Sequence, residues 1–170
     1  MKKFFITGIS GSGKSSVLEK INEKGFSVID IDSVGGLCKW IHVDTQREEK
    51  WSHGMTEGWY KSHKYICDKK KLSLLIASSK SDVFVAGLPS NRRDLLELFD
   101  KVFFLQCKED TSLKRIKERI SHDFGKHVLE QENLLSWYKD FEADMLNRGA
   151  ISINTDRPLV NVAEDILTNI

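Results

Sequence analysis

One glycine-rich segment near the start of the chain constrains the fold more than any other feature of the sequence. Residues 8–15 read Gly-Ile-Ser-Gly-Ser-Gly-Lys-Ser and match the pattern G-x-x-x-x-G-K-[ST] at every fixed position. The apolar run 4–7 before it predicts a buried strand, and residues 15–24 after it predict a helix with one apolar face. The segment therefore joins a predicted strand to a predicted helix.

Each fixed position of the pattern has a physical task. The glycines let the backbone turn its N–H groups inward, and these groups form an anion site with the start of the following helix. Lys14 adds positive charge for the β- and γ-phosphates, and Ser15 offers a hydroxyl to Mg²⁺. A plain glycine turn is the alternative interpretation. We predict a nucleoside triphosphate with Mg²⁺, contacted by Gly8, Ser10, Gly11, Ser12, Gly13, Lys14, Ser15 and Ser16.

Strands and helices alternate along the rest of the chain. Further strands are predicted at residues 26–31, 82–87, 102–106 and 151–153. Between them we expect a mostly helical stretch at 55–79, short helices near 93–99 and 113–120, a loop at 121–128, one long helix ending at Gly149, and a last helix after Pro158. Such alternation predicts an α/β fold with a parallel sheet covered by helices on both faces, in a single domain, 1–170.

Composition excludes several classes of protein. The net charge of +1 lacks the excess of basic residues that is typical of proteins that bind nucleic acid or an anionic membrane. No apolar run approaches the ~20 residues of a membrane span. Cys38, Cys67 and Cys107 lie far apart without a CxxC pair, which is typical of reduced, buried thiols in a cytoplasmic protein.

A phosphate-binding loop alone does not choose among a kinase, a switch GTPase and a motor ATPase. The sequence contains no guanine-reading NKxD motif, and the DxxG match at residues 32–35 lies so close behind the first loop that we interpret it as chance. With 170 residues, the chain is short for a motor ATPase, and no long downstream strand ends in the acidic pair that such machines use. A small kinase is the remaining class.

Three segments together resemble a known family. The loop at 8–16, "VIDID" at 28–32 and "VFVAGLP" at 83–89 are similar to the nucleoside monophosphate kinase-like group, which includes adenylate kinase and shikimate kinase. The resemblance implies a three-layer α/β/α core with a five-stranded parallel sheet and ATP as donor. It also implies an acceptor-binding segment at about 33–80 and a short lid at about 115–128.

Asp30 and Asp32 end the second predicted strand. Because side chains alternate along a strand, both carboxylates point to the same face, at the edge where open α/β sheets bind ligands. The pair resembles the Asp-x-Asp of shikimate kinase. The resemblance implies that Asp30 holds Mg²⁺ through water and that Asp32 binds or deprotonates an acceptor hydroxyl. Solvated loop carboxylates, or Asp32 as a helix cap, are the alternatives.

The segment after the third predicted strand resembles the Asp-Gly-Phe-Pro-Arg of adenylate kinase, with two departures. Ala86 replaces the metal-bound aspartate, so Asp30 becomes the more important candidate for binding Mg²⁺. Ser90 replaces the arginine. Arg92 and Arg93 follow closely and are expected to substitute for that arginine in acceptor binding, together with Gly87. An ordinary strand-ending turn is the alternative for Gly87.

Further basic residues are implied by the family at the donor side. Arg115 and Arg119 are one helical turn apart in the expected lid, where arginines stack on the adenine or clamp the transferring phosphoryl group. Arg157 and Pro158 follow the last predicted strand, where the family's loop packs on the adenine. The alternative for Arg115 and Arg119 is a solvated basic helix face. The alternative for Arg157 and Pro158 is an ordinary helix start.

The acceptor segment is rich in aromatic residues, which are suited to covering a flat or apolar acceptor or to core packing. They are Trp40, His42, Trp51, His53, Trp59, Tyr60 and His63. We predict a phosphotransferase that moves the γ-phosphate of Mg-ATP to a small molecule, either a nucleoside monophosphate or a metabolite hydroxyl. A regulatory ATP-binding protein with slow or no turnover is the alternative, and the oligomeric state stays open.

Overall fold

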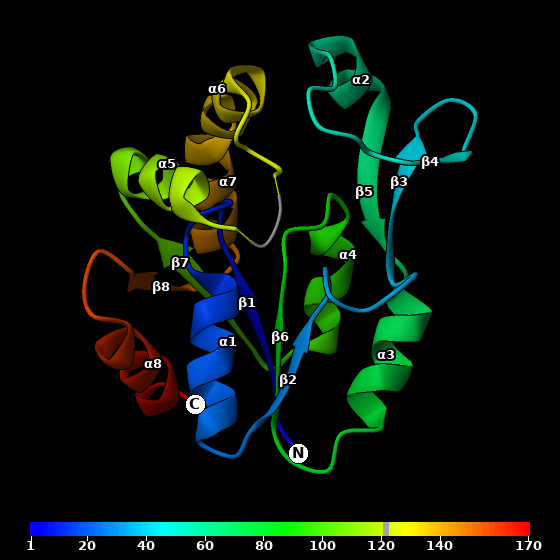
Figure 1. Ribbon diagram of the computed structural model, residues 1–170. Coiled ribbons are helices and arrows are strands. Elements are labelled where there is room, and N and C mark those ends of the chain that lie inside the picture. The colour runs from blue at the N-terminus through cyan, green and yellow to red at the C-terminus, as the bar shows by residue number, and fades with distance from the viewer. Residues whose placement is uncertain (121–122) are drawn as a thin grey trace.

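A five-stranded, all-parallel sheet forms the centre of the molecule in the computed structural model, which describes residues 1–120 and 123–170. The strand order is β2-β6-β1-β7-β8 (Figure 1). The strands are β1 (Lys3–Thr7), β2 (Ser27–Asp30), β6 (Val83–Ala86), β7 (Lys101–Gln106) and β8 (Ile151–Asn154). The sheet predicted from the alternation of strands and helices is therefore confirmed.

Helices cover both faces of this sheet. Alternation along β1 sends Phe4 and Ile6 to one face and Phe5 to the other, so the strand is buried on both sides. On the first face the sheet packs against α1 (Lys14–Glu23) and α8 (Leu159–Thr168). On the second it packs against α3 (Lys69–Ala77), α4 (Arg92–Leu95) with the 3₁₀ turn η1 (Leu96–Leu98), and α7 (Tyr138–Asn147). The three-layer arrangement is confirmed.

A second sheet interrupts the stretch at 55–79, which was predicted to be mostly helical, with a strand between two helices. Strands β3 (Cys38–His42), β4 (Glu48–Glu49) and β5 (His63–Cys67) form an antiparallel sheet in the order β4-β3-β5. Only α2 (Glu57–Ser62) and α3 are helical here, and Thr56 and Asp68 cap them separately. Five residues of β5 pair one by one with β3, and this long-range pairing outweighs the local helical pattern.

The expected long helix is also divided. Helix α6 (Val128–Ser136) ends before Trp137, and α7 begins after it. The apolar periodicity correctly predicts a buried face, formed by Leu134, Tyr138, Phe141 and Met145, but it does not predict the break at Trp137. A short helix was predicted near 113–120, but α5 (Glu109–Glu118) ends before Ile120, which is 98% exposed.

The carboxyl ends of the parallel strands meet at one edge, between α5 and α6 on one side and the β3–β5 sheet on the other (Figure 1). Both termini lie at the opposite edge. No helix within residues 1–120 and 123–170 is long and apolar enough to cross a membrane. Ligands of open α/β sheets bind at the carboxyl edge, which directs attention to the loops there.

Candidate functional site

The glycine-rich segment forms a tight loop between β1 and α1. Gly11 and Gly13 have φ angles of 79° and 95°, in the left-handed region that glycine adopts without strain. A Cβ atom on Gly11 would lie 2.4 Å from the carbonyl oxygen of Ser112 in α5. The Ser112 hydroxyl in turn donates a 2.8 Å hydrogen bond to the Ser10 carbonyl. The loop is therefore held in shape by its own backbone and by α5.

Lys14 folds back over this loop. Its Nζ donates hydrogen bonds to the carbonyls of Gly8 and Ile9, at 2.8 and 3.0 Å. Burial lowers the pKa of Lys14 to about 8, and the carboxylates of Asp32 and Asp30 oppose this shift. The amine is thus held at the loop in a position to meet phosphate oxygens.

The structure brings together Ser15 and Asp30, the two residues that we expected at a Mg²⁺ site. The Ser15 hydroxyl donates a 2.8 Å hydrogen bond to the Asp30 carboxylate, which ends β2 beside Ala86 of β6. A hydroxyl and one carboxylate fit Mg²⁺, which keeps several waters and binds through few protein oxygens plus substrate phosphates. Within the described parts of the chain, no group of three or more His, Cys, Asp or Glu side chains could hold a metal ion.

Asp32 is held from two sides. Its backbone N–H donates to Asp30 Oδ1 at 3.1 Å, and the Tyr65 hydroxyl of β5 donates to Asp32 Oδ1 at 2.9 Å. Burial, followed by the Asp32 charge, raises the pKa of Tyr65, so this hydroxyl stays protonated and donates. The chain runs from β2 through turns into β3, so Asp32 does not cap a helix there.

The adjacent residues Arg92 and Arg93 make different side-chain contacts. Arg93 forms a two-pronged ion pair with Asp144 of α7, at 3.0 and 2.9 Å. Arg92 lies over the ring of Phe141, 4.3 Å from its centroid, and its buried Nε finds no hydrogen-bond partner among the described residues. Burial lowers the pKa of Arg92. Arg92 is therefore the better placed of the two to receive an anionic group.

Arg115 and Arg119 lie at the start of the predicted lid. Residues 115–118 belong to α5, and residues 121–122 of the predicted lid lie outside the described residues. Arg115 donates to the hydroxyl and the carbonyl of Thr155, at 3.1 and 2.7 Å, and approaches the Gly11 carbonyl at 3.4 Å. Arg119 donates to the Phe124 carbonyl. Arg115 thus links the phosphate loop to the segment after β8, where Arg157 also lies.

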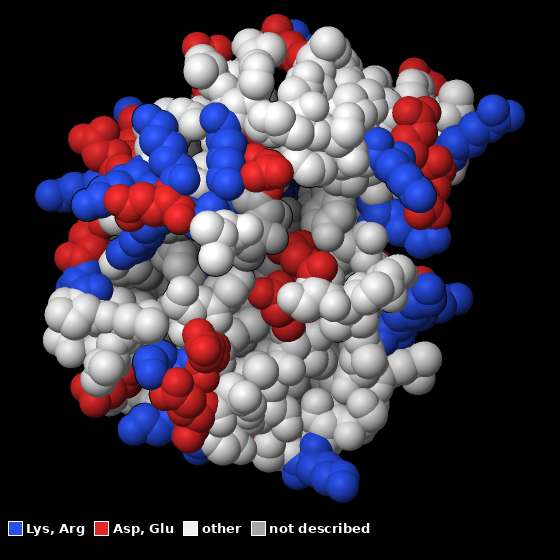
Figure 2. All heavy atoms as spheres, viewed as in Figure 1, with Lys and Arg blue, Asp and Glu red and all other residues white. Residues whose placement is uncertain are grey.

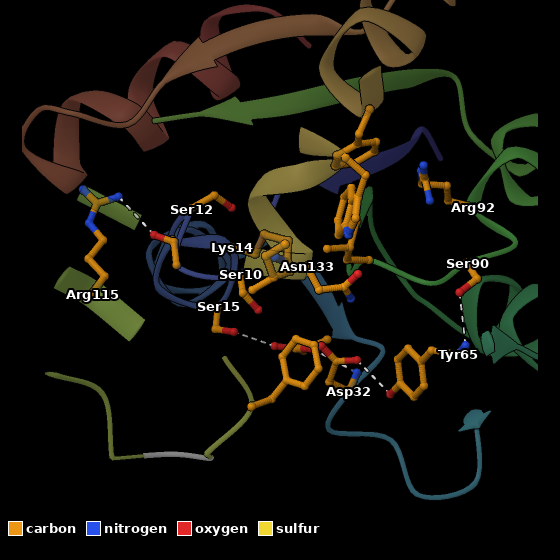
Figure 3. Close-up of a pocket in the computed structure, with 18 of the residues that line it drawn as sticks. Ser10, Ser12, Lys14, Ser15, Asp32, Tyr65, Ser90, Arg92, Arg115 and Asn133 are labelled. Carbon is orange, nitrogen blue, oxygen red and sulfur yellow. Dashed lines mark hydrogen bonds between the residues drawn. The ribbon is translucent and has the colours of Figure 1, made fainter. Parts of the chain in front are cut away.

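One cavity of about 1400 Å³ contains most of the predicted residues (Figure 3). The predicted residues on its wall are Ser10, Gly11, Ser12, Gly13, Lys14, Ser15, Ser16, Asp30, Asp32, Arg92, Arg93, Arg115, Arg119 and Arg157. Gly8, Gly87 and Pro158 are not among its described lining residues. Gly87 instead packs under Ile31, where a Cβ atom would lie 2.1 Å from the Ile31 side chain. Its close fit accounts for a glycine there through packing.

Several lining residues were not singled out from the sequence. Ser90, Phe124, Asn133, Trp137, Asp140 and Phe141 all line the cavity. Asn133 and Asp140 lie in α6 and α7, on helices whose sequence signal was only their apolar periodicity. The one sequence signal that could have indicated Asn133 and Asp140 as cavity residues is their position next to the apolar residues of these helices. The space-filling view shows the molecule hollowed between these helices and the β3–β5 sheet, with basic and acidic side chains interspersed around it (Figure 2).

Comparison with known families agrees with this geometry. A family model named AAA_18 and described as "AAA domain" matches residues 5–140. The chain belongs to the AAA_18 family. The match extends from β1 into α7 and includes the phosphate loop, both aspartates and the lid arginines.

Solved structures of small kinases share the fold. A gluconokinase from Sinorhizobium meliloti 1021 has a TM-score of 0.58 and 21% identity, covering 99% of this chain and 92% of that one. A shikimate kinase from Acinetobacter baumannii in complex with shikimate has a TM-score of 0.61 and 14% identity, with 99% and 92% covered. A sugar kinase from Janibacter sp. HTCC2649 has a TM-score of 0.56 and 18% identity, covering 99% of this chain and 93% of that one. No curated protein matches the sequence. The expected relation to small P-loop kinases is confirmed at the level of fold.

Proposed function

We propose that this protein is a kinase that transfers the γ-phosphate of Mg-ATP to a hydroxyl group of a small acceptor. One observation carries the proposal: a single cavity has the phosphate loop with Lys14 at one end and the Tyr65-bonded carboxylate of Asp32 opening into the same space. A carboxylate held beside a triphosphate site is suited to accept the proton of an acceptor hydroxyl.

The donor half is formed by the phosphate loop and its neighbours. Inward N–H groups of the loop and the start of α1 bind the phosphates, and Lys14 leaves its two loop carbonyls to meet them. Ser15 and Asp30 would hold Mg²⁺, which supplies neutralisation of phosphate charge when it is bound. Arg115, tied to Thr155, closes the donor half at the side of the β8–α8 loop.

The acceptor half lies between Asp32 and Arg92. Asp32 would accept the proton of the acceptor hydroxyl. The hydroxyl oxygen would at the same time bond to the γ-phosphorus, while the bond between that phosphorus and the β–γ bridging oxygen breaks. Tyr65 holds the carboxylate in place. Arg92, whose Nε lacks a partner within the described residues, would bind an anionic group on the acceptor. Trp40 and Tyr60 line the wall beside them and would cover its apolar face.

Arg119 would complete the neutralisation of charge on the transferring group. It lines the cavity, and Asp32 is among the charges that act on it. Such a mechanism rests on positioning and charge neutralisation more than on covalent chemistry. Because a hydroxyl has a proton to give up and a phosphate acceptor does not, the positioned Asp32 favours a hydroxyl acceptor over a nucleoside monophosphate.

A melting screen followed by a phosphate-transfer assay tests the proposal. Mg-ATP is combined with shikimate, sugars, sugar acids, amino alcohols and nucleoside monophosphates, since a ligand that binds the native state raises the melting temperature. A hydroxyl compound that raises it further should be phosphorylated, and Lys14→Ala and Asp32→Asn should each abolish that transfer. Stabilisation by Mg-ATP with no acceptor among these classes would overturn the proposal in favour of a regulatory ATP-binding protein.

A further inference from the structure

Two thiols face each other at the base of the three-stranded sheet. Cys38 is the first residue of β3, Cys67 is the last residue of β5, and their Cα atoms are direct partners in the antiparallel register. At this point both strands leave the sheet and enter the core, where Cys38 and Cys67 pack with Leu37 and Leu72. The pair therefore lies at the junction between the three-stranded sheet and the rest of the molecule.

The backbone hydrogen bonds define how close the two cysteines are. The N–H and C=O of Cys67 both bond to the side-chain amide of Asn91, at 3.0 and 2.9 Å, and so point away from β3. Cys38 and Cys67 are thus a non-hydrogen-bonded pair, the kind whose Cα atoms are about 4.5 Å apart. That separation is within the range of about 4.4–6.8 Å found across disulfides.

The side chains of the pair share one face of the sheet. Two residues further along, the equivalent pair Trp40 and Tyr65 has ring centroids 5.3 Å apart, which shows that partners of this register meet. A hydrogen bond from the Cys38 thiol lowers the pKa of the Cys67 thiol, although burial acts in the opposite direction. The same pairing and burial raise the pKa of Cys38, the half-exposed thiol of the two.

We propose that Cys38 and Cys67 form a reversible disulfide by exchange with a low-molecular-weight disulfide such as oxidised glutathione. One S–S bond forms between the two Sγ atoms and the S–S bond of the oxidant breaks. The two cysteine thiols lose two electrons and two protons, and the oxidant takes them up as two free thiols. Cys107 has no part in this reaction, because it is buried beside Arg115 and Thr155 at the end of β7.

The cross-link has two consequences for the molecule. It closes residues 38–67 into a covalent loop, which restricts the unfolded chain and fixes β3 to β5. It also draws the Cys38 sulfur into a bond with Cys67, and this sulfur is one of the groups that act on the Tyr65 hydroxyl beside Asp32. Only this second consequence, an effect on the acceptor half, depends on the proposed function.

Thiol counting and mass spectrometry on the full chain test the proposal directly. The Cys107→Ser variant is incubated with oxidised glutathione at neutral pH. We expect both remaining thiols to disappear with an intact mass lower by two hydrogens, a melting temperature higher by roughly 5–10 °C, and full reversal by dithiothreitol. Amide hydrogen exchange in β3 and β5 should slow in the oxidised form. Cys38→Ser and Cys67→Ser, each combined with Cys107→Ser, should show no rise in melting temperature.

Two results would overturn the proposal: both thiols staying free in the Cys107→Ser variant, or a stable glutathione adduct without an internal disulfide. None of these readouts requires turnover. A failed acceptor screen with a formed disulfide would reject the proposed function and keep this inference. A successful acceptor screen without a disulfide would keep the proposed function and reject this inference.

Discussion

The Tyr65 hydroxyl donates a 2.9 Å hydrogen bond to the Asp32 carboxylate across 33 positions of sequence. Asp32 follows β2 of the main sheet, while Tyr65 belongs to β5 of the second sheet. The bond therefore links the turn after β2, beside the phosphate loop, to the sheet that bounds the proposed acceptor half. It gives the second sheet a role in positioning a carboxylate.

Replacing Tyr65 with phenylalanine should lower kcat/KM for the acceptor. Hydrogen bonds to charged groups are worth about 1.5–3 kcal/mol, so we expect a loss of roughly tenfold or more. The stabilisation by Mg-ATP should be unchanged, because Tyr65 lies on the acceptor side. Steady-state kinetics with the acceptor found by screening measures the effect. Tyr138→Phe is the matched control, since its hydroxyl bonds to the Cys107 carbonyl away from the cavity. Equal losses in both variants would contradict a specific role for Tyr65.

Binding of ATP should take up a proton at alkaline pH. Burial lowers the pKa of Lys14 to about 8 in the unliganded protein, so the amine is mostly neutral at pH 9. Phosphate charges favour its protonated form and raise that pKa on binding. At pH 7 Lys14 is already protonated, so uptake by this group should be small there and approach one proton at pH 9.

Calorimetric titration with Mg-ATP in two buffers of different ionisation enthalpy measures this uptake. The affinity should weaken above pH 8 by at most tenfold per pH unit. Lys14→Arg retains its charge at pH 9 and should abolish the pH-dependent uptake. Uptake that persists in Lys14→Arg would assign the proton to another group.

The phosphate loop was predictable from the sequence because its conformation is set locally. Glycines at fixed spacing, a buried strand before them and a helix after them all lie within a single stretch of chain. Strand alternation, and the rule that ligands bind at the carboxyl edge, directed attention to Asp30 at the end of β2 and to Asp32 in the turns after it.

The acceptor half was not predictable in the same way. Tyr65 reaches Asp32 because β5 pairs with β3, and that pairing depends on residues that are 20 or more positions apart. Arg92 and Arg93 are adjacent arginines, and they are distinguished by distant partners: Phe141 beneath Arg92, and Asp144, 51 positions from Arg93. Long-range contacts of this kind leave no local pattern.

Substitution of Gly11 by alanine should destabilise the protein. Its φ of 79° is strained for any other residue, and the new Cβ would lie 2.4 Å from the Ser112 carbonyl oxygen. We expect a loss of roughly 2–3 kcal/mol in the free energy of unfolding, measured by urea denaturation. Gly35→Ala is the control, because no atom lies within 4 Å of its Cβ position. A Gly11→Ala protein as stable as Gly35→Ala would mean that the loop and α5 are not packed as described.

Glu130 should be among the most sensitive positions outside the phosphate loop. Its carboxylate is 1% exposed and accepts hydrogen bonds from the Tyr60 hydroxyl at 2.9 Å and the Gly125 N–H at 2.7 Å. Tyr60 belongs to α2 and accepts in turn from Trp51, so this carboxylate ties α6 to the acceptor-side segment. Removing it would leave several buried donors without partners.

Glu130→Ala should therefore cost roughly 2–4 kcal/mol of the free energy of unfolding. Glu130→Gln should cost less, because it retains one oxygen acceptor and much of the shape. Glu132→Ala, an exposed neighbour on the same helix, should change stability by no more than about 0.5 kcal/mol. Urea denaturation gives all three values, and hydrogen exchange in α2 should accelerate in Glu130→Ala alone. If Glu130→Ala matched Glu132→Ala in both measurements, α6 would be stabilised by its apolar contacts and the Tyr60–Glu130 bond would be a secondary contact.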